Sequence, residues 1–129
     1  VWAGRLIASK RVDVAADVAA RAGLALVVIG RGAVPAPPGV LHLGQLPRDE
    51  TLAWIAGATA LLSTSRDEGA PTVVREARAL GVPVVAEPSG DLEAWARADP
   101  GIAIARGALA LGEALQAIAA RAGAPRVSD

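Results

Sequence analysis

Short apolar runs alternate with longer segments of helical periodicity along the whole chain. Residues 24–29 and 82–86 are apolar at nearly every position, which is typical of parallel strands buried on both faces. Residues 12–21 and 109–121 instead repeat apolar side chains every three or four positions and are followed by glycine. The pattern therefore predicts strands and helices in alternation.

The predicted strands lie at residues 1–3, 24–29, 40–43, 59–63, 82–86 and 102–104. The predicted helices lie at residues 12–21, 48–56, 71–80, 91–98 and 109–121. Alternation at this spacing favours right-handed βαβ units. We predict an α/β fold with a doubly wound, Rossmann-like parallel sheet of about six strands in the order 3-2-1-4-5-6 and helices on both faces. In that order the turns after the first and fourth strands open onto one crevice, where such sheets bind ligands.

The composition limits the chemistry that the chain can perform. Its 129 residues are enough for one domain with its own core. The absence of Cys excludes disulfides and thiolate metal sites, and the single His42 excludes a His cluster, so no metal and no cofactor are expected. Basic and acidic residues balance at 13 each without charged runs, which disfavours nucleic acid as a partner. A small molecule is the expected ligand.

No apolar run reaches the length of about 20 residues that a membrane span requires, and no leader peptide is recognisable. We therefore expect a soluble, cytoplasmic protein. The chain begins at Val1 within a predicted strand, which indicates a fragment of a longer protein. Peripheral attachment to the inner face of the membrane through a missing half is left open.

The stretch from residue 58 to residue 85 carries the strongest candidate site. After an apolar run it places Glu68 and Gly69 in a turn, and Pro71 is predicted to start a helix that Gly81 terminates. The free N–H groups of a helix start form an anion site, and Gly69 permits close approach of a ligand. Glu76 would lie on the flank of a packed stripe. Alternatively, both glutamates are solvated residues that the helix dipole favours.

That packed stripe is predicted to consist of Val73, Ala77 and Leu80, which follow one another at helical spacing.

The turn after the first strand carries Gly4, Arg5 and Lys10. Arginine offers a planar fork of donors and lysine a compact charge, and the two together suit a diphosphate. Solvated surface cations are the alternative, but Lys10 is the only lysine in a chain that otherwise uses arginine. Gly30-Arg31-Gly32 follows the second strand, where a dinucleotide fingerprint does not belong, and it is interpreted as a structural turn. His42 is expected to be a packed strand residue rather than a base.

Four ordered segments resemble the donor-binding, C-terminal domain of GT-B glycosyltransferases, in particular the retaining enzymes of family four. The first is the string Glu68-Gly69-x-Pro71-x-Val73-x-x-Glu76-Ala77 with Gly81-x-Pro83-Val84-Val85, which resembles the paired-glutamate motif. Gly4-Arg5-Leu6 followed by Lys10 resembles the second signature. Segments 40–46 and 89–93 resemble two further segments of the family's pattern, although Ser89 replaces a glycine in the second of them. Other departures are Arg11, Thr64 and Ala70, where the family often has glycine, proline and a bulky residue.

The resemblance implies a role for each matching residue. Arg5 and Lys10 would contact the donor's phosphates, Glu76 the ribose hydroxyls and Glu68 the donor sugar. The backbone at Gln45 and Leu46 would touch the nucleobase. The remaining implied donor-site residues are Gly4, Gly69, Ala70, Pro71, Thr72 and Val73. Arg5, Lys10 and Glu68 would carry the catalytic role, without a metal or cofactor.

We therefore interpret residues 1–129 as a single nucleotide-sugar binding domain, the C-terminal half of a two-domain enzyme. The resemblance implies transfer of a hexose-type sugar from a UDP-, GDP- or ADP-sugar to an acceptor held by the missing N-terminal domain. The isolated chain is expected to be inactive. Two alternatives remain: a sugar-nucleotide epimerase or phosphorylase built on the same fold, and a non-catalytic nucleotide-binding domain.

Overall fold

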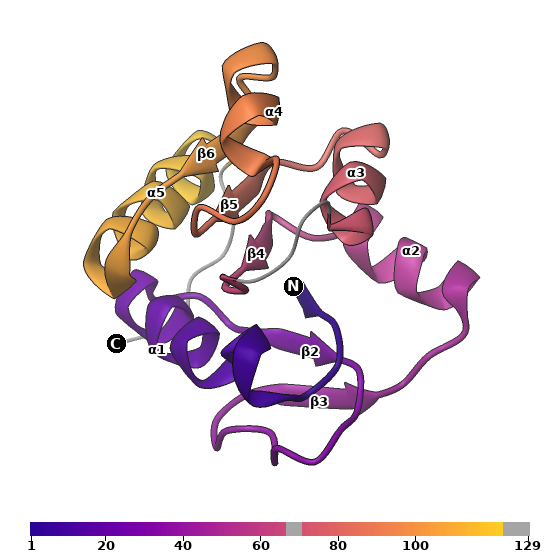
Figure 1. The fold of residues 1–129 in the computed structure, drawn as a ribbon. Coiled ribbons are helices and arrows are strands. Elements are labelled where there is room, and N and C mark those ends of the chain that lie inside the picture. The colour runs from indigo at the N-terminus through magenta and orange to yellow at the C-terminus, as the bar shows by residue number, and fades with distance from the viewer. Residues whose placement is uncertain (67–70, 123–129) are drawn as a thin grey trace.

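The computed structural model describes residues 1–66 and 71–122 (Figure 1). Strands and helices follow one another in the predicted order, and they alternate except that a loop without a helix joins the strands ending at residue 29 and beginning at residue 41. The strands are β1 (Trp2–Ala3), β2 (Val27–Ile29), β3 (Leu41–Gly44), β4 (Leu61–Ser63), β5 (Val84–Ala86) and β6 (Ile102–Ile104). The helices are α1 (Val12–Ala22), α2 (Arg48–Ala56), α3 (Thr72–Ala79), α4 (Leu92–Ala98) and α5 (Gly107–Ala122), with a 3-10 turn, η1 (Ala8–Lys10), before α1.

All strand pairs in the described chain are parallel, and they form two three-stranded sheets in the orders β1-β2-β3 and β4-β5-β6. The predicted single sheet of six strands is therefore not confirmed. β1 has only two residues. The hydrogen bonds that connect this part of the chain to β4 are made by Val1, the residue before β1. The amino group of Val1 donates to the Ala60 carbonyl at 2.9 Å, and the Leu62 N–H donates to the Val1 carbonyl at 2.9 Å.

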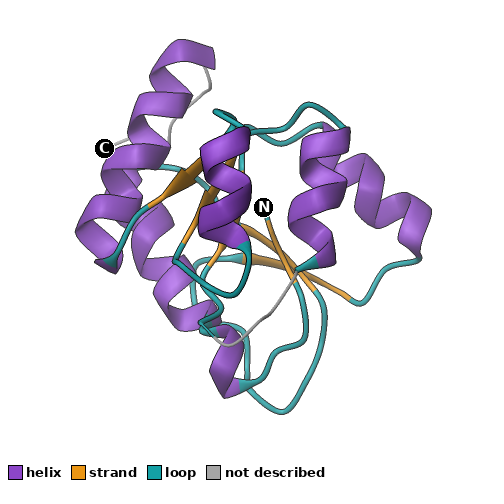
Figure 2. Cartoon of the chain, turned by 45° about the horizontal axis from the view of Figure 1, so that its top comes forward, coloured by secondary structure: helices purple, strands orange, loops and turns teal. Residues whose placement is uncertain are grey.

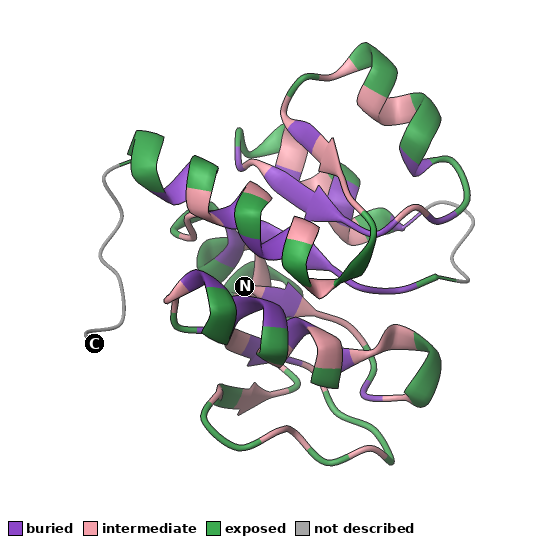
Figure 3. Cartoon of the chain, turned by 90° about the vertical axis from the view of Figure 1, so that its left-hand side faces the viewer, coloured by how far each residue is buried: buried purple, intermediate pink, exposed green. Residues whose placement is uncertain are grey.

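Side chains that alternate along β4 and β5 enter two separate apolar clusters. Leu62 and Val85 pack with α1 and α5 on one face. Leu61, Val84 and Ala86 pack with α2, α3 and α4 on the other face. The strands consequently run between helices (Figure 2), and the buried positions gather along them (Figure 3). Helices thus cover both faces of the β4-β5-β6 sheet, as the sequence predicts for a Rossmann-like fold.

Helix α3 differs from its predicted form. Pro71 is the N-cap, with φ −65° and ψ 117°, and not the first helical residue. Val74 and Ala77 are the buried positions of the helix, whereas Leu80 is 43% exposed. The predicted stripe is confirmed at Ala77 and at the half-buried Val73, which packs against the same cluster, but it is wrong at Leu80, which is the C-cap, and it omits the buried Val74.

Candidate functional site

The turn between β1 and α1 carries the predicted phosphate-binding residues at the carboxyl end of a parallel strand. It runs through η1 and reaches Arg11, which has φ 58° and ψ 50° and caps α1. A left-handed conformation costs a non-glycine residue about 1–2 kcal/mol. Arg11 stands where the resembling family often has glycine, and its backbone has the conformation that glycine adopts readily.

The segment Gly30-Arg31-Gly32 forms backbone hydrogen bonds with this turn and packs closely against it. The Gly4 N–H donates to the Ile29 carbonyl and the Leu6 N–H to the Arg31 carbonyl, both at 3.0 Å. A Cβ on Gly30 would lie 1.8 Å from the Gly4 oxygen, and one on Gly32 would lie 2.3 Å from the Leu6 oxygen. The two glycines are thus required by backbone packing, which agrees with their interpretation as a structural turn.

Arg5 and Lys10 lie on this turn with different degrees of exposure. Arg5 is exposed and Lys10 is half-buried. Burial lowers the pKa of Lys10 below its ordinary value of 10.5, and the nearby charge of Arg5 lowers it further. The two cations are therefore close enough to repel one another, so an anion bound beside them would relieve this repulsion.

Thr64 joins the turn to the end of β4. It is fully buried, and its Oγ1 lies 2.8 Å from the Lys10 carbonyl and 2.9 Å from the Arg11 carbonyl. The indole of Trp2 donates to the same Oγ1 at 3.1 Å. Thr64 marks one of the sequence's departures from the family pattern, and here it fixes the backbone at Lys10 and Arg11.

The second part of the predicted site consists of the start of α3 and the residues directly before it. Glu68, Gly69 and Ala70 fall outside the described residues. Pro71 is buried, Thr72 is exposed and Val73 is half-buried. The Val74 N–H already reaches the Pro71 carbonyl, so the N–H groups of Thr72 and Val73 stand at the helix start, where anions bind.

Glu76 pairs with a residue that the sequence analysis did not single out. Arg48, the first residue of α2, donates through Nη1 to Oε2 of Glu76. The Glu76 side chain is 18% exposed, compared with 72% for Arg48. Gln45 and Leu46, the predicted nucleobase contacts, lie in the segment directly before α2, with Gln45 exposed and Leu46 half-buried. Arg48 thus connects this segment to the predicted ribose contact.

Glu87 is the one charged residue that is buried among residues 1–66 and 71–122. It follows β5, at the same end of the sheet as Thr64. Its Oε1 lies 3.4 Å from Arg11 Nη1 and 3.7 Å from Arg66 Nη2. The sequence offered no signal for this cluster, because the chain position of a carboxylate does not reveal its burial.

His42 is exposed, so the expectation of a packed strand residue is wrong. It lies on β3 at the edge of its sheet and donates through Nε2 to the Gly30 carbonyl at 2.7 Å. In the part of the chain that the structure describes, no group of three or more His, Cys, Asp and Glu side chains could hold a metal ion. Of the described helices, none combines the length and the apolarity needed to cross a bilayer.

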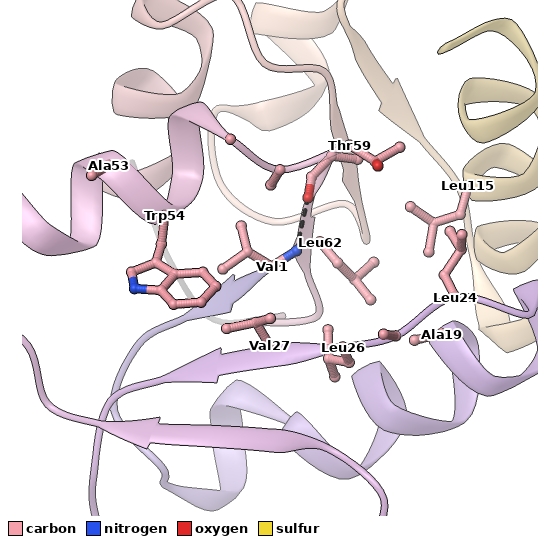
Figure 4. A pocket seen from close by; sticks show the side chains of 14 residues that line it. Val1, Ala19, Leu24, Leu26, Val27, Ala53, Trp54, Thr59, Leu62 and Leu115 are labelled. Carbon is pink, nitrogen blue, oxygen red and sulfur yellow. Dashed lines mark hydrogen bonds between the residues drawn. The ribbon is translucent and has the colours of Figure 1, made fainter. Parts of the chain in front are cut away.

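An apolar cavity of about 500 Å³ lies at the opposite, amino ends of β2 and β4 (Figure 4). Leu26 and Val27 line it from β2 and the residue before it, Trp54 from α2, and Leu115 from α5. The side chain of Val1 also points into it. None of the predicted donor-site residues lines this cavity, so it is separate from the candidate site.

A family model described as "Glycosyl transferases group 1" matches residues 1–121. Several solved structures are similar to this chain, and they include these three. One is AviGT4, a glycosyltransferase involved in avilamycin A biosynthesis, with 24% identity and a TM-score of 0.73 over 98% of this chain and 42% of AviGT4. TarM has 16% identity and a TM-score of 0.69 over 90% of this chain and 30% of TarM.

The third is the lipopolysaccharide outer core galactosyltransferase WaaB, with 26% identity and a TM-score of 0.56 over 69% of this chain and 30% of WaaB. The chain therefore spans less than half the length of each of these three structures. No curated protein sequence matches it. Together with the fold, these matches confirm the predicted resemblance to the C-terminal domain of a GT-B glycosyltransferase.

Proposed function

This chain belongs to the family of group 1 glycosyl transferases, and from that premise we propose that it is the nucleotide-sugar donor domain of a retaining, family-four-like glycosyltransferase. The full-length protein would move a hexose-type sugar from a UDP-, GDP- or ADP-sugar to an acceptor. An N-terminal domain outside this chain would hold that acceptor. The span of less than half of AviGT4, WaaB and TarM supports this division.

The observation that carries the proposal is the pair of Arg5 and Lys10 on the first turn. Burial and then the charge of Arg5 lower the pKa of Lys10, so a bound diphosphate would offset the mutual repulsion of the two cations. Both residues match the family's phosphate-binding signature. The start of α3 adds the N–H groups of Thr72 and Val73 as further anion donors.

We further propose that the six strands belong to one sheet in the order 3-2-1-4-5-6. The hydrogen bonds of Val1 with Ala60 and Leu62 support adjacent β1 and β4. The hydrogen bonds from Thr64 to the Lys10 and Arg11 carbonyls support contact between the turns that follow these strands. The donor's diphosphate would lie in the crevice between these turns.

In the proposed reaction the bond between the anomeric carbon and the diphosphate oxygen breaks, while the acceptor oxygen attacks from the same face. The electron pair of the broken bond stays on the diphosphate, and the acceptor's proton leaves with that product. Arg5, Lys10 and the α3 start stabilise the charge on the leaving diphosphate, which is electrostatic preorganisation rather than acid–base catalysis. Glu76 binds the ribose hydroxyls and Glu68 binds the donor sugar.

Titration of this chain with UDP-, GDP- and ADP-sugars by calorimetry tests the proposal. One nucleotide class should bind more tightly than the others, and its nucleoside should bind more weakly than its diphosphate. Equal affinity for nucleoside and diphosphate across all three classes would contradict a phosphate site. The chain alone should transfer no sugar to an added acceptor, because half of the cleft is missing.

A further inference from the structure

Glu87 carries a buried charge that the proposed reaction does not use. It is 2% exposed and follows β5, and its N–H donates to the Ser63 carbonyl at 3.0 Å, which extends the β4–β5 ladder. A carboxylate in such a place is retained at a high desolvation cost unless cations or N–H donors compensate it. The cations and donors around Glu87 therefore indicate the role of its carboxylate.

Three separate segments converge on a single oxygen of Glu87. Arg11 Nη1 from the first turn lies 3.4 Å from Oε1, and Arg66 Nη2 from the segment after β4 lies 3.7 Å from it. The N–H of Gly107, the first residue of α5, donates to it at 3.4 Å. These distances are long for hydrogen bonds, so the attraction is mainly one of charge.

The partner on the first turn is the residue with the strained backbone. Arg11 directly follows Lys10, and the single hydroxyl donor of Thr64 lies within hydrogen-bonding distance of both of their carbonyls. Arg11 Nη1 also lies 3.5 Å from the Thr64 carbonyl. The turn that carries Lys10 is thus fixed through its backbone by Thr64 and through the Arg11 side chain by Glu87.

We propose that Glu87 is a positioning residue for the diphosphate: by holding Arg11 it fixes the first turn and so the place of Lys10, and by holding Arg66 it ties this turn to the segment after β4. The proposal rests on the proposed function, because it requires the first turn to be the phosphate site. Glu87 does not touch the ligand.

The direction of the effect separates positioning from simple electrostatics. Glu87→Gln keeps the shape and an acceptor oxygen but removes one negative charge. If Glu87 acted only through its charge on the ligand, its loss would tighten diphosphate binding. If it positions the turn, the loss weakens diphosphate binding, because Arg11 and Arg66 no longer have a common anchor.

The test compares UDP with uridine, GDP with guanosine and ADP with adenosine on wild type and Glu87→Gln. For the class that binds, we expect the ratio of diphosphate to nucleoside affinity to fall about tenfold, which corresponds to about 1.4 kcal/mol, while the nucleoside affinity stays unchanged. A merely structural role would lower both affinities in proportion to the folded fraction. An unchanged or increased ratio in Glu87→Gln, together with a reduced ratio in Lys10→Ala, overturns the positioning role. A wild-type ratio of one overturns the proposed function instead.

A second pair of variants keeps the test decisive should Glu87→Gln fold poorly. Arg11→Gly suits the left-handed backbone and removes the contact to Glu87, whereas Arg11→Lys keeps a positive charge at the same place. We expect the affinity ratio to fall in Arg11→Gly and to recover in Arg11→Lys. Equal ratios in wild type, Arg11→Gly and Arg11→Lys overturn the proposal.

Discussion

Arg48 donates a hydrogen bond to the carboxylate of Glu76 and thereby joins the first turn of α2 to the middle of α3. The contact uses Oε2 of Glu76, and among the described residues no other side chain pairs with this carboxylate. A carboxylate can accept about four hydrogen bonds, so Glu76 can accept ribose hydroxyls while Arg48 stays in place. Arg48 would then orient Glu76 before the nucleotide arrives.

Glu76→Gln is expected to weaken the binding of a nucleoside diphosphate and of its sugar conjugate by the same factor, roughly tenfold, because both contain the ribose. Calorimetry with UDP, GDP and their glucose or mannose conjugates measures the two affinities. Glu113→Gln, an exposed position on α5, is the matched control and should leave both unchanged. A loss confined to the sugar conjugate would contradict the assignment to ribose.

Glu68→Gln is expected to leave the bare nucleotide almost unaffected and to reduce the additional affinity that the sugar contributes, by about one to two kcal/mol. Glu68 lies outside the described residues, and its assignment to the sugar comes from the sequence resemblance. The same calorimetric series measures the affinities of Glu68→Gln for the bare nucleotide and the sugar conjugate beside those of Glu76→Gln. Should Glu68→Gln impair the bare nucleotide as strongly as Glu76→Gln does, the two glutamates do not have separate roles.

Lys10→Ala and Arg5→Ala are each expected to weaken a nucleoside diphosphate more than its nucleoside. The loss of a charge-assisted hydrogen bond costs about 1.5–3 kcal/mol, or roughly tenfold to a hundredfold in affinity. Arg21→Ala is the control, because it removes an exposed arginine that pairs with Asp17 on α1. If wild type and both turn variants bind the diphosphate equally, the first turn is not the phosphate site.

Diphosphate affinity is expected to fall at a lower pH than it would if Lys10 had the ordinary pKa of a lysine. Burial and Arg5 lower the pKa of Lys10 below 10.5, so Lys10 loses its charge in the folded chain before it does so when unfolded. Between the two pKa values the unfolded chain binds more protons, so stability rises with pH there while diphosphate binding weakens. Affinities measured as the pH rises toward 10.5 should show this decline in wild type. Lys10→Arg, which stays charged, should lack it.

The ion pair of Arg78 and Asp99 is expected to make stability depend on acid pH. Arg78 Nε lies 2.7 Å from Asp99 Oδ2, and the Gly101 N–H lies 2.9 Å from Oδ1. The hydrogen bond from Arg78, followed by that from Gly101, holds the pKa of Asp99 below 3.8. The contribution is therefore present above pH 3.8 and is lost as the pH falls through the lower, folded-state pKa.

Thermal unfolding of Asp99→Asn checks this expectation. The variant should melt below wild type at pH 7, and the difference should shrink as the pH approaches 2. Gly101→Ala should also lower the melting temperature, because its Cβ would lie 2.1 Å from Arg78 Cζ. A constant difference between Asp99→Asn and wild type from pH 7 to pH 2 would show that the carboxylate's charge is not involved.

The order of strands and helices was predictable because apolar periodicity is a local property. Helix α2 and strand β6 have the predicted bounds, whereas β2 begins at Val27 and not at residue 24. Strand ends depend on where a neighbouring strand pairs, and β2 pairs with β3 from Val27 onward. Such partners are distant in sequence, so the pattern along one segment does not fix them.

A sequence motif can nominate residues such as Arg5 and Lys10, whose roles stay predictions, but it cannot nominate residues whose importance depends on burial. The pattern gave no indication of Glu87, because its partners Arg11 and Arg66 come from two distant turns. In the sequence, Arg48 likewise cannot be told from other surface arginines, because its pairing with Glu76 depends on how α2 and α3 pack. Interactions between segments far apart in sequence account for both omissions.

The hydrogen bond between Trp2 and Thr64 gives the first turn an optical reporter. Trp2 is 3% exposed, whereas Trp54 is 42% exposed and lies beside the cavity at the other ends of the strands. An indole in apolar surroundings emits at shorter wavelength than one in water, so Trp2 contributes to the blue side of the emission together with the half-buried Trp95. Because Thr64 also holds the carbonyls of Lys10 and Arg11, a diphosphate that shifts this turn changes the emission without any attached label.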